Sequence, residues 1–329
     1  MDKKTQILKL VDEYITEKHS KKIWKPGEHW VQYSGPYFTS DEYIRSVESL
    51  LSEWLVLGGD AQKFEKKFPK FFGKNHGVLT NSGSSANLLM MLAMTSKKHY
   101  NFPKGTKVIT PIAGFPTTLN PIYQVGFEPV FVDIELDSLN LDIDQVEKVA
   151  KESGAKIITF AHVLGNPPNM DKLMDIVERY NLILLEDCCD ALGSTYDGKE
   201  LGSFGDMASC SFYPAHHISM GEGGFVSVNT LQEERIVRSF REWGRDCYVF
   251  DHKYVYGEIG YNLKPIELQA SMGLAQIEKL DEIHSRRREN HSLLMNIFSK
   301  YEEYFHLPTP TEKSNPSWFA FPLTIKDNT

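Results

Sequence analysis

The sequence has few features of a secreted, membrane-bound or nucleic-acid-binding protein. Its 329 residues include only four cysteines, two of them adjacent, which is not a disulfide framework. No apolar run reaches the length of a membrane span, and residues 1–22 form a charged amphipathic pattern instead of a signal peptide. There is no basic run, and 36 Lys and Arg against 44 Asp and Glu give a net charge of −8. We therefore expect a cytoplasmic protein with no nucleic-acid or membrane partner.

Short apolar runs alternate with helical patterns through the middle of the chain. The strand candidates are residues 107–111, 129–133, 155–162, 182–187, 208–213 and 224–228, and the helix candidates are residues 84–94, 141–152, 171–180 and 231–243. Runs that are apolar throughout and are separated by helices indicate strands covered on both faces. The pattern predicts an α/β fold with a mostly parallel sheet flanked by helices.

The rest of the chain divides around this region. Residues 1–33 are expected to form an N-terminal helical extension, and residues 34–264 a large domain. A single helix, charged on one side, is predicted from residue 265 to about 301. It leads to "SWFAFPLTIKDNT", which is interpreted as the first strand of a small C-terminal domain. Residues 265–329 would then be a linking helix and an incomplete start of that domain.

Two groups of polar residues follow apolar runs, where ligands bind in open α/β sheets. "NSGSSAN" at residues 81–87 precedes a helix, and its small residues are typical of a phosphate site or of an ordinary N-cap. Asp187 follows the apolar run "LILL". A carboxylate there needs a partner because desolvation is costly. That partner could be a protonated ring nitrogen of a cofactor or a structural salt bridge.

The third group is "SFYPAHHISMGEGG" at residues 211–224, with two adjacent histidines near a strand end. A lone histidine is more often a packed core or surface residue than a catalytic one. A metal site is less favoured, because adjacent residues in a strand point to opposite faces.

In order and spacing the three groups resemble the fold type I enzymes that use pyridoxal phosphate (PLP), in particular the DegT/DnrJ/EryC1-type sugar aminotransferases. This resemblance implies that residues 34–264 bind PLP or pyridoxamine phosphate (PMP). It also implies a homodimer, because an asparagine in "GYNLKPIELQA" matches one that reaches the neighbouring subunit's phosphate. The implied cofactor-binding residues are Gly83, Ser84, Ser85 and Ser211 at the phosphate, Asp187 at the pyridine nitrogen, Asp190 near the 3-hydroxyl, Phe115 against the ring and Asn262 from the partner.

His216 lies where those aminotransferases have their Schiff-base lysine. The 4-keto-6-deoxyhexose 3-dehydrases share this replacement, and "EDCCDALGSTY", "FREWGRDC", "DHKYVYGEIGYNL" and "PSWFAFP" resemble the CDP-4-keto-6-deoxyglucose 3-dehydrases of lipopolysaccharide O-antigen pathways. A histidine, with a pKa near ~6.5 against ~10.4 for lysine, exchanges protons at neutral pH. The resemblance implies PMP-dependent removal of the C3 hydroxyl of a nucleotide-linked sugar, with His216 as the catalytic base and His217 pointing away.

The CDP-sugar enzymes carry an iron–sulfur cluster on four cysteines. Cys189 and Cys247 match two of these positions, but Val249 occupies the third and the fourth is missing. Because the cluster needs four thiolates, we expect no cluster and no metal, and a reductase partner only if a cluster were present. Two alternatives remain. One is a GDP-4-keto-6-deoxymannose 3-dehydrase that recycles its cofactor with glutamate, and the other is a shortened homologue without activity.

Overall fold

The computed structural model describes residues 1–32, 34–246 and 254–326. Its centre is a seven-stranded sheet in the order β1-β9-β8-β5-β4-β2-β3. Only β9 runs antiparallel to its neighbours, so the sheet is mostly parallel, as predicted. The strands are β1 (His76–Thr80), β2 (Lys107–Pro111), β3 (Glu128–Val132), β4 (Ile157–Ala161), β5 (Ile183–Asp187), β8 (Met207–Ser211) and β9 (Gly224–Val228).

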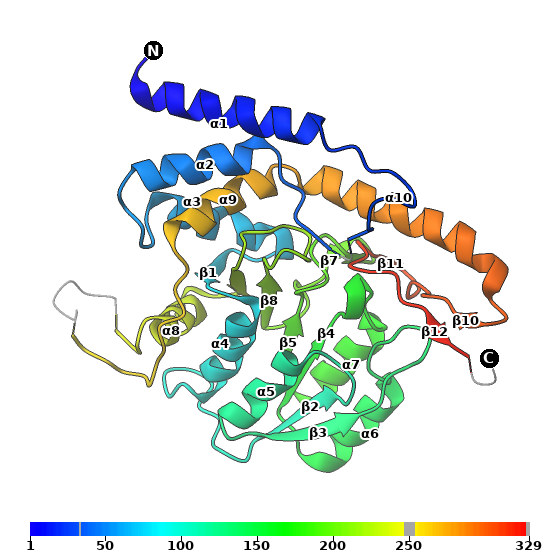
Figure 1. Cartoon of the computed structure of the whole chain (residues 1–329). Coiled ribbons are helices and arrows are strands. Elements are labelled where there is room, and N and C mark those ends of the chain that lie inside the picture. Colours follow the sequence, from blue (N-terminus) through cyan, green and yellow to red (C-terminus); the bar gives the residue numbers. More distant parts are fainter. Residues whose placement is uncertain (33, 247–253, 327–329) are drawn as a thin grey trace.

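Helices cover both faces of this sheet (Figure 1). On one face α4 (Gly83–Thr95), α5 (Pro116–Gln124) and α8 (Leu231–Arg241) enclose one hydrophobic core. On the other, α3 (Gly59–Lys67), α6 (Ile143–Ser153) and α7 (Met170–Tyr180) enclose a second. Successive strand residues enter opposite cores: Leu184 packs beneath α6 and α7, and Leu185 beneath α4. This alternation decides which polar residues of β5 and β8 face the site.

The N-terminal helices and the helices after residue 265 pack together at one end of the molecule (Figure 1). α1 (Lys3–Ser20) lies on α2 (Ser40–Leu51), and α2 lies on α9 (Glu267–Ile277). The prediction of one helix from residue 265 to about 301 was wrong, since α9 ends before α10 (Leu280–Phe298) begins. Lys279 leaves the helical conformation between them, with φ −108° and ψ 4°, and its Nζ lies 2.7 Å from the buried Glu42 carboxylate. This distant ion pair has no signature in the local sequence.

The last part of the chain lies against the large domain. The predicted strand in "SWFAFPLTIKDNT" is reduced to β12 (Thr324–Ile325), which pairs with β10 (Phe305–His306). β11 (Ser314–Asn315) joins β6 (Thr195–Tyr196) and β7 (Lys199–Glu200) in a small sheet. Short 3₁₀ turns occupy Phe68–Phe72, Val163–Gly165 and Ser299–Tyr301. Among the described residues, no helix is long and apolar enough to span a bilayer.

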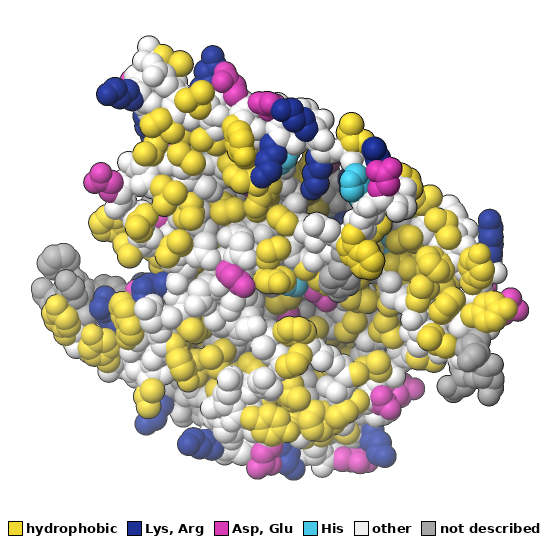
Figure 2. Space-filling model, viewed as in Figure 1, with side chains coloured by type: hydrophobic (Ala, Val, Ile, Leu, Met, Phe, Trp, Pro, Cys, Tyr) yellow, Lys and Arg dark blue, Asp and Glu magenta, His cyan; other side chains and the backbone are white. Residues whose placement is uncertain are grey.

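Two stretches expose many hydrophobic side chains, one at and after the end of α2 and one before α9, and Figure 2 shows hydrophobic side chains over both regions. The two stretches meet where the Glu267 amide donates to the Leu55 carbonyl at 3.1 Å. We call this surface the apolar edge. Its exposed members are Leu50, Leu51, Trp54, Leu55, Val56, Tyr254, Val255, Tyr256, Ile259, Tyr261 and Ile266.

Candidate active site

A cavity of about 570 Å³ opens beside the carboxyl ends of β5 and β8 and the N-terminus of α4. Sequence-predicted residues from distant parts of the chain meet there, as expected where parallel strands end. Two predicted residues do not line it: Ser85 and the exposed Asn262. The predicted residues that line the cavity are Gly83, Ser84, Phe115, Asp187, Asp190, Ser211 and His216.

The first turn of α4 forms one wall. Ser82 is the N-cap, and its Oγ accepts from the Ser85 amide at 3.1 Å, so Ser85 is engaged in the cap. The amides of Gly83 and Ser84 come earlier in the turn and have no intrahelical acceptor. A Cβ at Gly83 would lie 2.5 Å from Cβ and 2.9 Å from Oγ of Ser211. Only glycine lets the end of the helix approach β8 this closely. Because the cap uses the Ser85 amide, the amides of Gly83 and Ser84 stay available to an anion.

Asp187 lies at the end of β5 and is 3% exposed. Its Oδ2 accepts from Asn87 Nδ2 and from Thr118 Oγ1, both at 2.7 Å. Its Oδ1 accepts from the Cys189 amide at 3.1 Å. Near the end of β5, carboxylate–imidazole contacts join Glu186 to His162 and Asp190 to His216, and no ion pair between the described residues includes Asp187. Within that part of the chain, the salt bridge considered from the sequence is therefore not formed.

Asp187 also keeps capacity for another donor. Ser209 Oγ lies 3.3 Å from Asp187 Oδ1 but only 2.5 Å from Asn87 Oδ1. A hydroxyl has one proton, and the shorter contact takes it. Oδ1 is thus left with one backbone donor, although a carboxylate oxygen can accept two. The site contains a buried, oriented carboxylate with room for a cationic N–H.

The two histidines lie in a turn, because β8 ends at Ser211 and not at residue 213 as predicted. His216 lines the cavity. His217 is buried, and its Nε2 donates to the Ser317 carbonyl at 2.7 Å, away from the cavity lining. A turn separates neighbouring side chains as effectively as a strand does. The expected division between the two imidazoles is therefore seen, on a different backbone.

His216 approaches an acidic group and an aromatic ring. Its Nδ1 lies 3.5 Å from Asp190 Oδ1, and its ring centroid lies 5.0 Å from that of Phe319. Burial lowers the pKa of His216 to about 4, and burial followed by the charge of Asp187 raises the pKa of Asp190 to about 7. At neutral pH the imidazole is uncharged, and its buried Nδ1 has no hydrogen-bond partner among the described residues. A neutral imidazole is the form that accepts a proton.

Several residues of the site were not predicted. Asn87 and Thr118 donate to Asp187 directly, and Ser209 donates to Asn87. Asn87 could have been found, because it is a polar residue one turn into an apolar helix and is buried on the sheet side. Phe319 belongs to the motif "PSWFAFP", but nothing in the sequence indicated that its ring lines the cavity.

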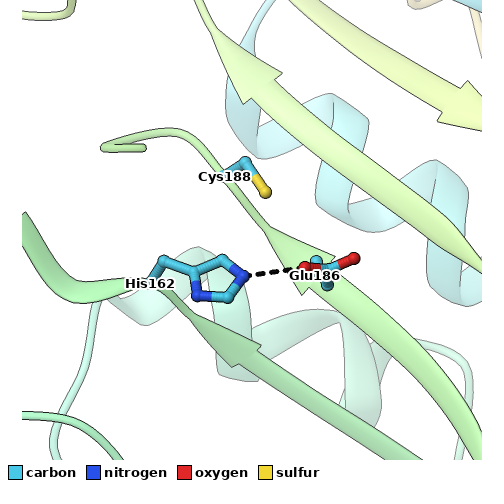
Figure 3. A group of neighbouring side chains, drawn as sticks. All are labelled: His162, Glu186 and Cys188. Carbon is cyan, nitrogen blue, oxygen red and sulfur yellow. Dashed lines mark hydrogen bonds and ion pairs between the residues drawn. The ribbon is translucent and has the colours of Figure 1, made fainter. Parts of the chain in front are cut away.

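Glu186 faces the opposite side of β5, where it meets His162 and Cys188 (Figure 3). All three are buried and could in principle hold a metal ion. However, Glu186 Oε2 accepts from His162 Nε2 and the Gly202 amide, both at 2.9 Å, and Oε1 accepts from the Gly205 amide at 2.6 Å. Burial raises the pKa of the Cys188 thiol well above its usual value, so it is a poor ligand. This group therefore acts as an anchor for the turn at residues 202–205.

The cysteines divide in the same way. Cys188 and Cys210 belong to the buried core, while Cys189 lines the cavity. The adjacent Cys188 and Cys189 therefore lie on different sides of the chain. Cys247 and Val249 lie outside the described residues, so the absence of a cluster stays a prediction.

Comparison with known proteins identifies the family of this chain. The model of the DegT/DnrJ/EryC1/StrS aminotransferase family matches residues 38–329. The chain belongs to this family. The predicted resemblance and the predicted fold class are thereby confirmed.

The relatives include sugar dehydratases. The lipopolysaccharide biosynthesis protein RfbH of Salmonella typhimurium is 44% identical, over 98% of this chain and 79% of that protein. The dTDP-4-dehydro-2,6-dideoxy-D-glucose 3-dehydratase of Saccharopolyspora spinosa is 40% identical, over 98% and 75%. Among solved structures, E. coli GDP-4-keto-6-deoxy-D-mannose-3-dehydratase with bound hydrated PLP has a TM-score of 0.84 and 31% identity, over 92% of this chain and 80% of that one. These names agree with the enzyme class expected from the sequence.

Proposed function

We propose that this protein is a lyase that removes the C3 hydroxyl of a nucleotide-linked 4-keto-6-deoxyhexose with the help of PMP. One observation carries the proposal. The cavity presents a half-buried imidazole, His216, which is neutral at pH 7, and the described residues that line the cavity include no lysine. An imidazole at the position of the aminotransferases' Schiff-base lysine can transfer protons but cannot bind a cofactor covalently as that lysine does.

The residues of the cavity fit the cofactor. The surface formed by Gly83 and Ser211 at the start of α4, here called the phosphate cup, leaves no room for a Cβ at position 83. The first turn of α4 offers free amides to a phosphate. Asp187 has an unused acceptor position for a protonated ring nitrogen. When bound, PMP would supply the amine that condenses with the 4-keto group and a ring that withdraws electrons. The proposed holding residues are Gly83, Ser84 and Ser211 for the phosphate, Asp187 for the ring nitrogen, Asp190 near the 3-hydroxyl and Phe115 for the ring face, whereas Ser85 takes part in the helix cap.

His216 is the proposed proton carrier. Its Nδ1 is buried and lies 3.5 Å from Asp190 Oδ1, so a bound ligand would meet the imidazole at its other ring nitrogen. Asp190, whose pKa burial raises to about 7, lies close enough to share a proton with Nδ1. The imidazole would take a proton from the bound cofactor and substrate and deliver it to the departing 3-hydroxyl. The sugar then loses water, and no net proton is left on the protein.

The adjacent histidines provide a matched test of this role. His216→Asn should abolish dehydration while the protein still binds PMP, because the substitution leaves the phosphate cup and Asp187 in place. His217→Asn is the control, since His217 bonds the Ser317 carbonyl outside the cavity lining. If His217→Asn lost turnover and His216→Asn kept it, the catalytic base would be His217 and the proposed assignment would be wrong.

CDP-4-keto-6-deoxyglucose is the favoured substrate, on the motifs in residues 186–196 and 240–247. A GDP-linked sugar with glutamate-dependent recycling is the second candidate, because the solved GDP-sugar enzyme shares the fold over 92% of this chain. Product analysis with the CDP, dTDP and GDP forms, each with and without glutamate, separates them. No product from any form, with PMP bound, would favour a non-catalytic homologue.

We also propose a homodimer in which Asn262 reaches the partner's phosphate. Asn262 is exposed and lies outside the lining of its own cavity. The apolar edge adjoins it through Tyr261 and gives a second copy a hydrophobic surface to cover. The domain division is part of this proposal: an extension at 1–33, a cofactor domain at 34–264 and a substrate-side segment at 265–329.

Mixed dimers test the shared site. Equal amounts of Asn262→Ala and His216→Asn chains should recover roughly a quarter of wild-type activity, because half the dimers are hybrids and each hybrid has one intact site. Light scattering should give the mass of two chains. A monomer, or inactive hybrids of proven composition, would refute the proposal.

A further inference from the structure

Three consecutive arginines on α10 point to three different environments. Arg286 is exposed and pairs with Glu289 at 3.3 Å, one turn along the same helix. Arg288 donates to the Gly193 carbonyl at 2.8 Å. Arg287 lies between them in sequence but turns toward the candidate site. Sequence alone presents them as one charged helix face.

The Arg287 guanidinium joins two segments that flank His216. Its Nη1 donates to the carbonyls of Trp318 and Phe319 at 3.1 and 3.0 Å. Its Nη2 donates to the carbonyl of Ala215, the residue before His216, at 3.3 Å. The planar fork of an arginine can hold several carbonyls in fixed relative positions, which a lysine ammonium does less well.

Each segment held by Arg287 contributes a group to the cavity. The turn that begins after Ser211 presents His216, and the Trp318–Phe319 segment places the Phe319 ring 5.0 Å from the imidazole. Phe319 is fixed on its other side, since its amide donates to the Leu164 carbonyl at 2.9 Å. Nδ1 of the His216 ring has no hydrogen-bond partner among the described residues. The backbone of His216 and the neighbouring Phe319 ring therefore contribute to the orientation of the imidazole.

We propose that Arg287 is a positioning residue, which sets the orientation of the His216 imidazole by clamping Ala215 to the Phe319 segment. This inference rests on the proposed role of His216 as the proton carrier. Arg287 does not line the cavity and is not a catalytic residue. It acts through the two segments that it ties together.

The charge of Arg287 also acts on His216. Burial is the main cause of the low pKa of His216, and Arg287 lowers it further against the opposing charge of Asp187. Removing the guanidinium should therefore raise the pKa of His216 from about 4. The other titratable groups near the imidazole or in the cavity lining are Asp187, Asp190, Cys189, Tyr213, Glu222 and the buried His217.

Three variants separate positioning from simple stability: Arg287→Met, Arg287→Lys and the exposed control Arg286→Met. Arg287→Met should lower kcat about 10- to 100-fold with little change in KM, since a displacement of ~1 Å has this effect on a catalytic group. Arg287→Lys keeps the charge and one donor group, so it should recover part of the loss. Arg286→Met should match the wild type.

A second readout needs neither substrate nor cofactor. The His216 imidazole, assigned by its absence in His216→Asn, is titrated by NMR in ¹⁵N-histidine-labelled protein. Its pKa should rise in Arg287→Met and stay near the wild-type value in Arg287→Lys. Normal kcat and an unchanged His216 pKa in Arg287→Met would overturn the inference, as would equal effects in Arg286→Met. If instead His216→Asn itself keeps full turnover, the proposed function fails and not the clamp, which the NMR titration reports independently.

Discussion

Replacing Asp187 by asparagine removes one negative charge from the cavity and keeps the size of the side chain. The carboxylate is held by Asn87, Thr118 and the Cys189 amide, with one acceptor position of Oδ1 unused. If that position receives a protonated ring nitrogen, Asp187→Asn loses one charge-assisted hydrogen bond. Such a bond contributes about 1.5–3 kcal/mol, which corresponds to a roughly 10- to 100-fold weaker Kd for PMP.

Glu186 supplies the matched control, because it is the neighbouring carboxylate on the opposite face of β5. Its oxygens accept from His162 and from the amides of Gly202 and Gly205, none of which lines the cavity. Glu186→Gln should lower the melting temperature and leave PMP affinity unchanged, whereas Asp187→Asn should mainly weaken PMP binding. Both are measured by calorimetric titration below the melting transition, beside thermal denaturation.

Two results would refute this reasoning. Wild-type PMP affinity in Asp187→Asn would mean that the carboxylate does not meet the cofactor. An equal loss of affinity in Glu186→Gln would mean that the loss reflects general loosening of β5 and not a direct contact.

Other predictions follow from the same geometry. His216→Lys should place a primary amine in the cavity, so that borohydride treatment with PLP traps an adduct on the peptide containing residue 216; no adduct at any pH would place that side chain away from the cofactor. Gly83→Ala should destabilise the fold by about 1–3 kcal/mol and weaken PMP binding, because its Cβ would meet Ser211 at 2.5 Å; unchanged melting and affinity would argue against the tight cup. Because burial holds the pKa of His216 at about 4, the neutral base persists as the pH falls below 6.5; single-turnover rates should decline only near pH 4, and a decline centred on 6.5 would contradict this. Anaerobic reconstitution with iron and sulfide should leave the protein colourless, since Cys189 and Cys247 supply only two thiolates; about two irons per chain would show that a cluster forms.

The order of apolar runs and helices was sufficient to predict the layered α/β fold. Uniformly apolar strands of five or six residues are stable only between two layers of helices, so the pattern has few alternatives. The position of Asp187 after such a strand, and of small residues before α4, was likewise readable. A charged or helix-capping residue at the end of a strand can be recognised from the residues next to it in the sequence.

The tertiary structure decided what those residues do for one another. The predicted long helix is interrupted at Lys279, whose ammonium group pairs with Glu42, more than two hundred residues earlier. Arg287 and Phe319 reach His216 from the last third of the chain, and no local pattern distinguishes Arg287 from Arg286. Hydrogen-bond partners, burial and the pKa shifts that follow depend on which segments meet in space. The sequence by itself therefore determined the fold and the groups available for chemistry, while packing between distant segments determined their orientation and protonation.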